Sequence, residues 1–95
     1  MAIVVRTTIR SADQEAHDRL DQSVEAAIAR LGGPPEGLMV HLAHPSGPDL
    51  LIVEVWRSES AFRSWWNDGM DPALVEAGLT AGEPDIFPVW SFARP

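Results

Sequence analysis

The sequence predicts one α+β domain over residues 1–95, with elements in the order β-α-β-β-α-β. Three observations lead to this prediction. Four segments are rich in β-branched and aliphatic residues, two regions between them repeat apolar residues at helical spacing, and clusters of Gly and Pro separate the segments. The length of 95 residues suits a single small domain.

The first predicted strand spans residues 2–10, which are rich in β-branched side chains. A helix follows, with Ser11 as its cap and Gln14 completing a capping box. The helix is predicted to end at Gly32 and Gly33, because two prolines directly after them prevent its continuation. Its apolar stripe consists of Ala16, Leu20, Val24, Ala27, Ile28 and Leu31.

A hairpin is predicted next, with strands at about 37–44 and 50–57 joined by turn formers at 45–49. We expect Ala43 to pair with Leu50 and His41 with Ile52. One face of the hairpin is then aliphatic and is predicted to lie under the helices, whereas the other is mixed and typical of a subunit interface. The aliphatic face comprises Leu38, Val40, Leu42, Leu51, Val53 and Val55, and the mixed face Met39, His41, Ile52, Glu54 and Trp56.

The second helical region begins at Ser58 or Ser60 and is predicted to break at Gly69. A short helix restarts at Asp71-Pro72 and ends at Gly78. The last predicted strand, 86–93, contains Pro88 and therefore belongs at a sheet edge. These elements predict a ferredoxin-like antiparallel sheet of strand order 4-1-3-2 with the helices on one face. Its open face would pair two copies into a homodimeric α/β barrel, with Trp90 in the contact.

The composition argues against several classes of function. A net charge of −7 disfavours nucleic acid and anionic membranes, which need basic patches. The chain has no cysteine and no apolar run long enough to span a bilayer, and its first residues enter a strand without a signal-peptide pattern. We therefore expect a cytoplasmic protein. His41 and His44 lie three apart on a strand and so on opposite faces, which predicts no metal site.

The segment 53–65, Val-Glu-Val-Trp-Arg-Ser-Glu-Ser-Ala-Phe-Arg-Ser-Trp, resembles the central motif of the antibiotic-biosynthesis-monooxygenase-like family. In that family a strand ends in Trp, a Ser or acidic cap follows, and an Ala-Phe pair lies on the next helix. Gly37 at the start of the second strand also fits. The resemblance implies the ferredoxin-like dimeric fold and an oxidoreductase that acts on a small aromatic molecule without a cofactor.

Two departures from the family matter for chemistry. Trp65 occupies a helix position where relatives often carry His, and Thr7 or Thr8 stands where the haem-degrading branch has Asn. Both departures disfavour haem. The resemblance then implies a pocket between sheet and helices, lined by Phe62, Trp65, Trp66 and Phe87, with Asn67 as a polar contact. The alternative is that these aromatic residues only pack the helix onto the sheet.

His41 beside Glu54 would be a general base oriented by a carboxylate. The alternative is a hydrogen-bonded pair, joined by Arg6, inside the dimer interface. Two hypotheses of function remain open at this stage. One is a cofactor-independent monooxygenase with His41, Glu54 and Asn67 as catalytic candidates, and the other is a non-catalytic dimer that binds a ligand or serves a structural role.

Overall fold

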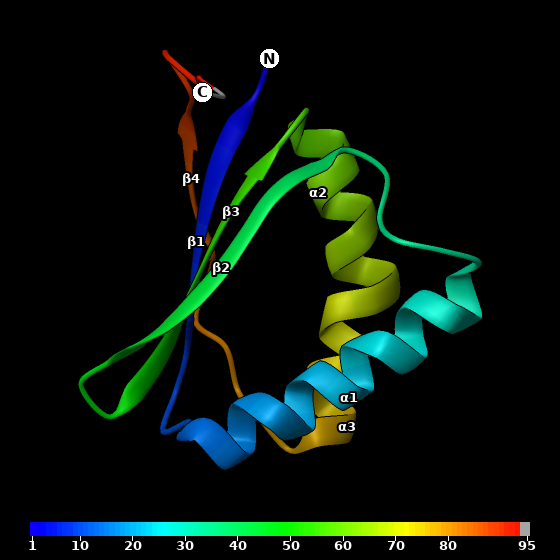
Figure 1. Cartoon of the computed structure of the whole chain (residues 1–95), viewed down its shortest axis with the longest axis vertical. Helices are drawn as coiled ribbons and strands as arrows, with labels where there is room; N and C mark the ends of the chain where they lie inside the picture. The colour runs from blue at the N-terminus through cyan, green and yellow to red at the C-terminus, as the bar shows by residue number, and fades with distance from the viewer. Residues whose placement is uncertain (94–95) are drawn as a thin grey trace.

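The computed structural model of the chain describes residues 1–93. Three α-helices and a π-helical segment lie on one side of a four-stranded antiparallel sheet (Figure 1). The strand order is β2-β3-β1-β4, which confirms the predicted ferredoxin-like arrangement. In chain order the elements are β1 (Ile3–Ile9), α1 (Gln14–Leu31), β2 (Leu38–Ser46), β3 (Asp49–Trp56), α2 (Glu59–Trp65), η1 (Trp66–Met70), α3 (Asp71–Ala77) and β4 (Asp85–Pro88).

The β2–β3 hairpin is tighter than predicted. Ser46 pairs with Asp49, so only Gly47 and Pro48 form the turn, with φ of +60° at Gly47. A two-residue turn of this kind favours Gly at its first position. The predicted pairs therefore slip by two residues, and His41 lies opposite Glu54 rather than Ile52.

The helices cover the opposite face of this hairpin from the one predicted. β1 pairs Ile3 with Trp56 and Thr7 with Ile52, and these four residues are buried. The other face of β1 carries Arg6 and Thr8, which are both exposed. Helices packed on that face would bury the charge of Arg6, and a buried charge needs an oppositely charged partner.

The predicted aliphatic core face is therefore the open face of the sheet. A bulge between Leu38 and Val40 lets Leu38 alone of that set pack against the core. The remaining members are half-buried or exposed: Val40, Leu42, Leu51, Val53 and Val55.

The N-cap of helix α1 lies two residues later than predicted. Asp13 is the N-cap, and its Oδ1 accepts a hydrogen bond from the backbone N–H of Ala16 at 2.9 Å. Ser11 instead takes a positive φ of 50° in the preceding turn, where its N–H donates to Oδ1 of Asp49 at 2.8 Å. The predicted end at Gly32 is confirmed, with φ of +92°.

The region after β3 is one continuous helical rod rather than two helices split at Gly69. Ser58 caps α2 as predicted, its Oγ accepting from the N–H of Ala61 at 3.2 Å. The π-helical turn η1 then carries the chain through Gly69 into α3. π-helical turns within helices are often found at functional sites.

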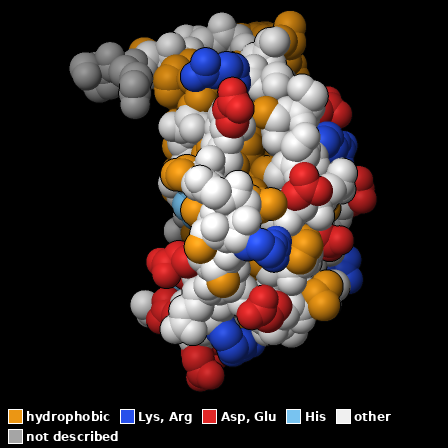
Figure 2. Space-filling view, turned by 90° about the vertical axis from the view of Figure 1, so that its right-hand side faces the viewer, with side chains coloured by type: hydrophobic (Ala, Val, Ile, Leu, Met, Phe, Trp, Pro, Cys, Tyr) orange, Lys and Arg blue, Asp and Glu red, His pale blue; other side chains and the backbone are white. Residues whose placement is uncertain are grey.

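The last strand is shorter than predicted. β4 ends at Pro88 rather than at residue 93, and it lies at the sheet edge as predicted. Acidic, basic and apolar side chains are interspersed on the side shown in Figure 2. Within residues 1–93, no helix is both long and apolar enough to cross a membrane.

Candidate functional site

A cavity of about 620 Å³ lies between α1 and the helix-facing side of β2 and β3. We call it the α1–sheet cavity. This volume is within the range of small-molecule sites. Its apolar walls come from α1, from the strands, from the loop between α1 and β2, and from the middle of the helical rod: Leu20, Val24, Ile28, Pro35, Leu38, Leu42, Ala43, Ile52, Trp65 and Met70. The sequence indicated Leu20, Val24 and Ile28 only as core positions.

A chain of hydrogen bonds runs from the buried core to this cavity. The indole N–H of Trp56, a wholly buried side chain, donates to Oε1 of Glu54 at 3.0 Å. The other carboxylate oxygen, Oε2, lies 2.7 Å from Nδ1 of His41. The side chain of Glu54 is 12% exposed and that of His41 is 45% exposed. Glu54 is therefore held from both sides, and His41 presents its ring to the cavity and to solvent.

The hydrogen bond that the His41 imidazole donates to Glu54 raises the pKa of His41 above its ordinary value of 6.5. Partial burial of the imidazole opposes this shift, whereas the negative charges of Glu54 and of Asp21 on α1 add to it. Around neutral pH the charged imidazolium is therefore more populated than in a free histidine. His41 can donate a proton there, and it becomes a base as the pH rises through its raised pKa.

The predicted partnership of His41 with Glu54 is confirmed, but its predicted place is wrong. The pair lies on the helix side of the sheet and lines the α1–sheet cavity, not the open face. Arg6, the expected third member, is exposed on the opposite face. The sequence placed Glu54 and Trp56 on one face correctly but did not predict the hydrogen bond between them.

The four aromatic residues predicted to share a pocket are not brought together. Phe62 is buried and packs edge-on against Trp56, with ring centroids 5.8 Å apart. Trp66 packs on Phe62 at 5.9 Å. Phe87 pairs with Val4 on the open face of the sheet. Only Trp65 of this set lines the α1–sheet cavity.

The third catalytic candidate, Asn67, is exposed on η1 and is not among the residues that line this cavity. Within residues 1–93, no group of three His, Asp or Glu side chains is arranged to hold a metal ion. The polar groups that the structure does offer to a ligand here belong to His41, Glu54 and the α1 residues His17, Asp21 and Glu25.

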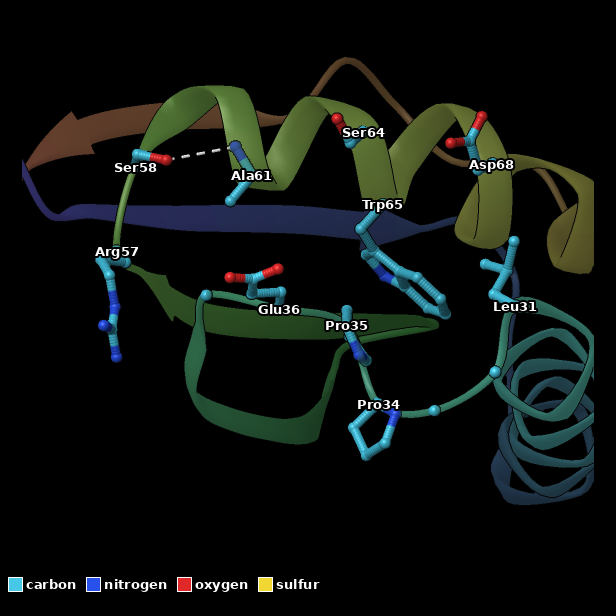
Figure 3. Close-up of a pocket in the computed structure, with 13 residues that line it drawn as sticks. Leu31, Pro34, Pro35, Glu36, Arg57, Ser58, Ala61, Ser64, Trp65 and Asp68 are labelled. Atoms are coloured by element: carbon cyan, nitrogen blue, oxygen red, sulfur yellow. Dashed lines mark hydrogen bonds between the residues drawn. The ribbon is translucent and has the colours of Figure 1, made fainter.

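A second cavity, of about 540 Å³, lies between α2 and the loop that joins α1 to β2 (Figure 3). We call it the loop cavity. Pro34 and Pro35 line its loop side, and Arg57 and Ser58 line the side at the start of α2. Trp65 projects from α2 into the space above Pro35 (Figure 3).

Solved structures resemble this chain over nearly its whole length. A mutant form of the cofactor-independent oxygenase SnoaB of Streptomyces nogalater aligns with a TM-score of 0.66 and 16% identity over 96% of this chain and 95% of its own. Rv0793 of Mycobacterium tuberculosis aligns with a TM-score of 0.62 and 14% identity over 99% and 100%. A candidate antibiotic biosynthesis monooxygenase of Deinococcus radiodurans aligns with a TM-score of 0.62 and 17% identity over 98% and 97%.

The chain has the fold of these proteins. This agrees with the family resemblance in residues 53–65, although identities of 14–17% concern the fold alone. No protein-family model matches the sequence, and a search among curated proteins gives no match. Function must therefore be argued from the cavity and its residues.

Proposed function

We propose that this chain is a cofactor-independent oxygenase of the antibiotic-biosynthesis-monooxygenase-like family, acting on an aromatic or otherwise apolar small molecule. The observation that carries the proposal is the hydrogen-bonded His41–Glu54 pair in the lining of a largely apolar cavity. The fold supports it, because SnoaB, one of the proteins that share it, is a cofactor-independent oxygenase.

The α1–sheet cavity suits such a ligand in size and lining. Most of its wall is aliphatic or aromatic, and its polar side chains are those of His41 and Glu54 on the sheet and of His17, Asp21 and Glu25 on α1. Ligand sites are typically apolar clefts with a few placed polar groups that fix orientation. An aromatic molecule with one hydroxyl or carbonyl would place that group near His41.

The chemistry needs a base and little else from the protein. A phenol whose keto tautomer carries a methylene next to an aromatic ring is acidic, and neutral His41 can take its proton. The resulting anion is electron-rich and can reduce O₂ by itself. In the net reaction, R₂CH₂ and O₂ give R₂C=O and H₂O, so O₂ is the sole oxidant and no external reductant is needed. Glu54 then stabilises the imidazolium that forms.

Oxygen uptake tests this proposal. Anthrone and 1-naphthol would be supplied to the wild type in an oxygen electrode, against blanks without protein. We expect uptake with at least one of them, and a loss of about a hundredfold or more in His41→Gln. His44→Gln is the matched control and should keep activity, because among residues 1–93 the His44 side chain bonds only the carbonyl oxygen of Pro45, at 2.9 Å, and does not line the cavity. Uptake that is equal in all three proteins, or absent from the wild type, would overturn the catalytic role.

A non-catalytic ligand-binding protein is the second candidate. It is favoured by the scarcity of polar groups in the cavity, since Asn67 lies outside its lining. Binding of 1-naphthol without oxygen uptake would support this candidate over the oxygenase.

We also propose that the protein is a homodimer through the open face of the sheet. That face carries a run of aliphatic side chains on β2 and β3, and Leu42 and Phe87 are each 46% exposed. A contiguous apolar surface of this kind is typical of a subunit contact. The helix-side residues Ile52 and Trp56, predicted for this contact from the sequence, are buried in the core and take no part in it.

A further inference from the structure

The two cavities share a wall. Trp65 and Pro35 line both the α1–sheet cavity and the loop cavity. In Figure 3 the Trp65 ring extends from α2 towards Pro35, across the space between the helix and the loop. The side chain is 7% exposed, so both of its sides are covered by protein or face a cavity.

The position of the ring depends on Gly69. A Cβ atom at residue 69 would overlap the six-membered part of the Trp65 indole, so this ring lies directly against the Gly69 backbone. Gly69 is buried within η1, and its φ is outside the left-handed region. Glycine is therefore needed at residue 69 to leave room for the Trp65 ring and not to allow an unusual backbone conformation.

The loop cavity differs chemically from its neighbour. Its polar lining residues carry both signs of charge: Glu36, Arg57, Ser58, Ser64 and Asp68. They surround the proline rings of the loop and the Trp65 ring, and in Figure 3 the Arg57 side chain extends away from Trp65. An extended polycyclic molecule could place one end beside His41 and the other in the loop cavity, but only if the Trp65 ring were absent.

We propose that Trp65 determines the specificity of the α1–sheet cavity by setting the length of the aromatic ligand. The ring closes the cavity on the side of the loop that joins α1 to β2, so compact aromatic molecules fit and extended ones are rejected. This inference rests on the proposed binding of an aromatic molecule there, and it assigns to Trp65 a role other than packing.

A pair of probes that differ only in length tests it: 1-naphthol and 4-phenyl-1-naphthol, titrated calorimetrically. We expect the wild type to bind 1-naphthol more tightly. In Trp65→Ala the ratio of the two dissociation constants should shift towards the longer probe by at least about tenfold, the discrimination that a few apolar contacts provide. Trp65→Leu removes the ring but keeps a bulky apolar side chain, and it provides the measurement if Trp65→Ala does not fold.

Trp66→Leu is the matched control. Trp66 is the next residue on the rod and lines neither cavity, so its loss should leave the ratio unchanged. An unchanged ratio in the Trp65 variants, or an equal shift in Trp66→Leu, would overturn the inference while leaving the ligand cavity in place. Failure of the wild type to bind either probe would overturn both the inference and the proposed ligand class. Oxygen uptake plays no part in these outcomes, so a failure of catalysis alone is distinguishable.

Discussion

The hydrogen bond from Trp56 to Glu54 gives the sharpest prediction about the site. Trp56→Phe keeps an aromatic ring in the core but removes the N–H that donates to Oε1 of Glu54 at 3.0 Å. Glu54 is 12% exposed, so water replaces that donor poorly. A hydrogen bond to a charged group contributes about 1.5–3 kcal/mol. The smaller ring adds a packing loss that any Trp→Phe change in this core would share.

Trp65→Phe measures that shared packing loss, because Trp65 is 7% exposed and its indole makes no side-chain hydrogen bond within residues 1–93. We expect Trp56→Phe to lower the free energy of unfolding by at least about 1.5 kcal/mol more than Trp65→Phe does. Urea denaturation followed by far-ultraviolet circular dichroism, at one protomer concentration, gives both values. Equal losses, or a larger loss in Trp65→Phe, would refute the view that Trp56 holds Glu54 in place.

Three further predictions follow from other contacts. Glu54→Gln should lower the pKa of His41, measured by NMR titration of its imidazole, because the Glu54 hydrogen bond is the main cause of the rise. The stability that this pair contributes should be fully present below pH 6.5 and lost as the pH rises through the raised folded-state pKa of His41; a wild-type advantage over Glu54→Gln that instead grows with pH would contradict this. Gly69→Ala should destabilise the wild type, although Ala is the better helix former by about 1 kcal/mol. The same change should be harmless in Trp65→Ala, where no ring meets the new methyl group. Calorimetric melting of the wild type, both single variants and the double variant tests this, and an equal effect of Gly69→Ala in both backgrounds would count against it. Val53→Glu should yield monomers by light scattering at micromolar concentration, whereas Glu83→Gln, in the loop before β4, should stay dimeric; a dimeric Val53→Glu would rule out the sheet-face contact.

Much of the fold could be predicted because local signals agree with one another. The β-branched run of β1, the Ser58 cap and the glycine end of α1 each act within a few residues. Pro88 placed β4 at an edge because a missing donor has the same consequence in any sheet. Gly69 was misjudged because a buried glycine can serve a neighbouring ring as well as break a helix.

The covered face of the hairpin could not be decided from the hairpin itself. Alternation shows which side chains share a face, and both faces of β2 and β3 are apolar enough to be buried. The choice was made by β1, whose Arg6 and Thr8 must stay in contact with water. Placing that strand beside β3 before choosing the covered face would have brought Glu54 and Trp56 under the helices.

The wrong choice of the covered face also misplaced the site. His41 and Glu54 were correctly paired, but they were assigned to the open face of the sheet instead of the helix-covered face. The contribution of α1 to the cavity was hidden because Leu20, Val24 and Ile28 have the spacing of ordinary core residues. A cavity remains beside these residues because of the distance between α1 and the sheet. Local sequence patterns do not predict that distance.

The location of a bound aromatic molecule tests the central claim most directly. Backbone amide shifts would be followed by NMR as 1-naphthol is added to the protein. We expect the largest shifts at Leu20, Val24 and Ile52, which line the α1–sheet cavity, and at His41. Shifts concentrated at Val53 and Phe87 on the open face, or no shifts at saturating probe, would contradict binding in this cavity.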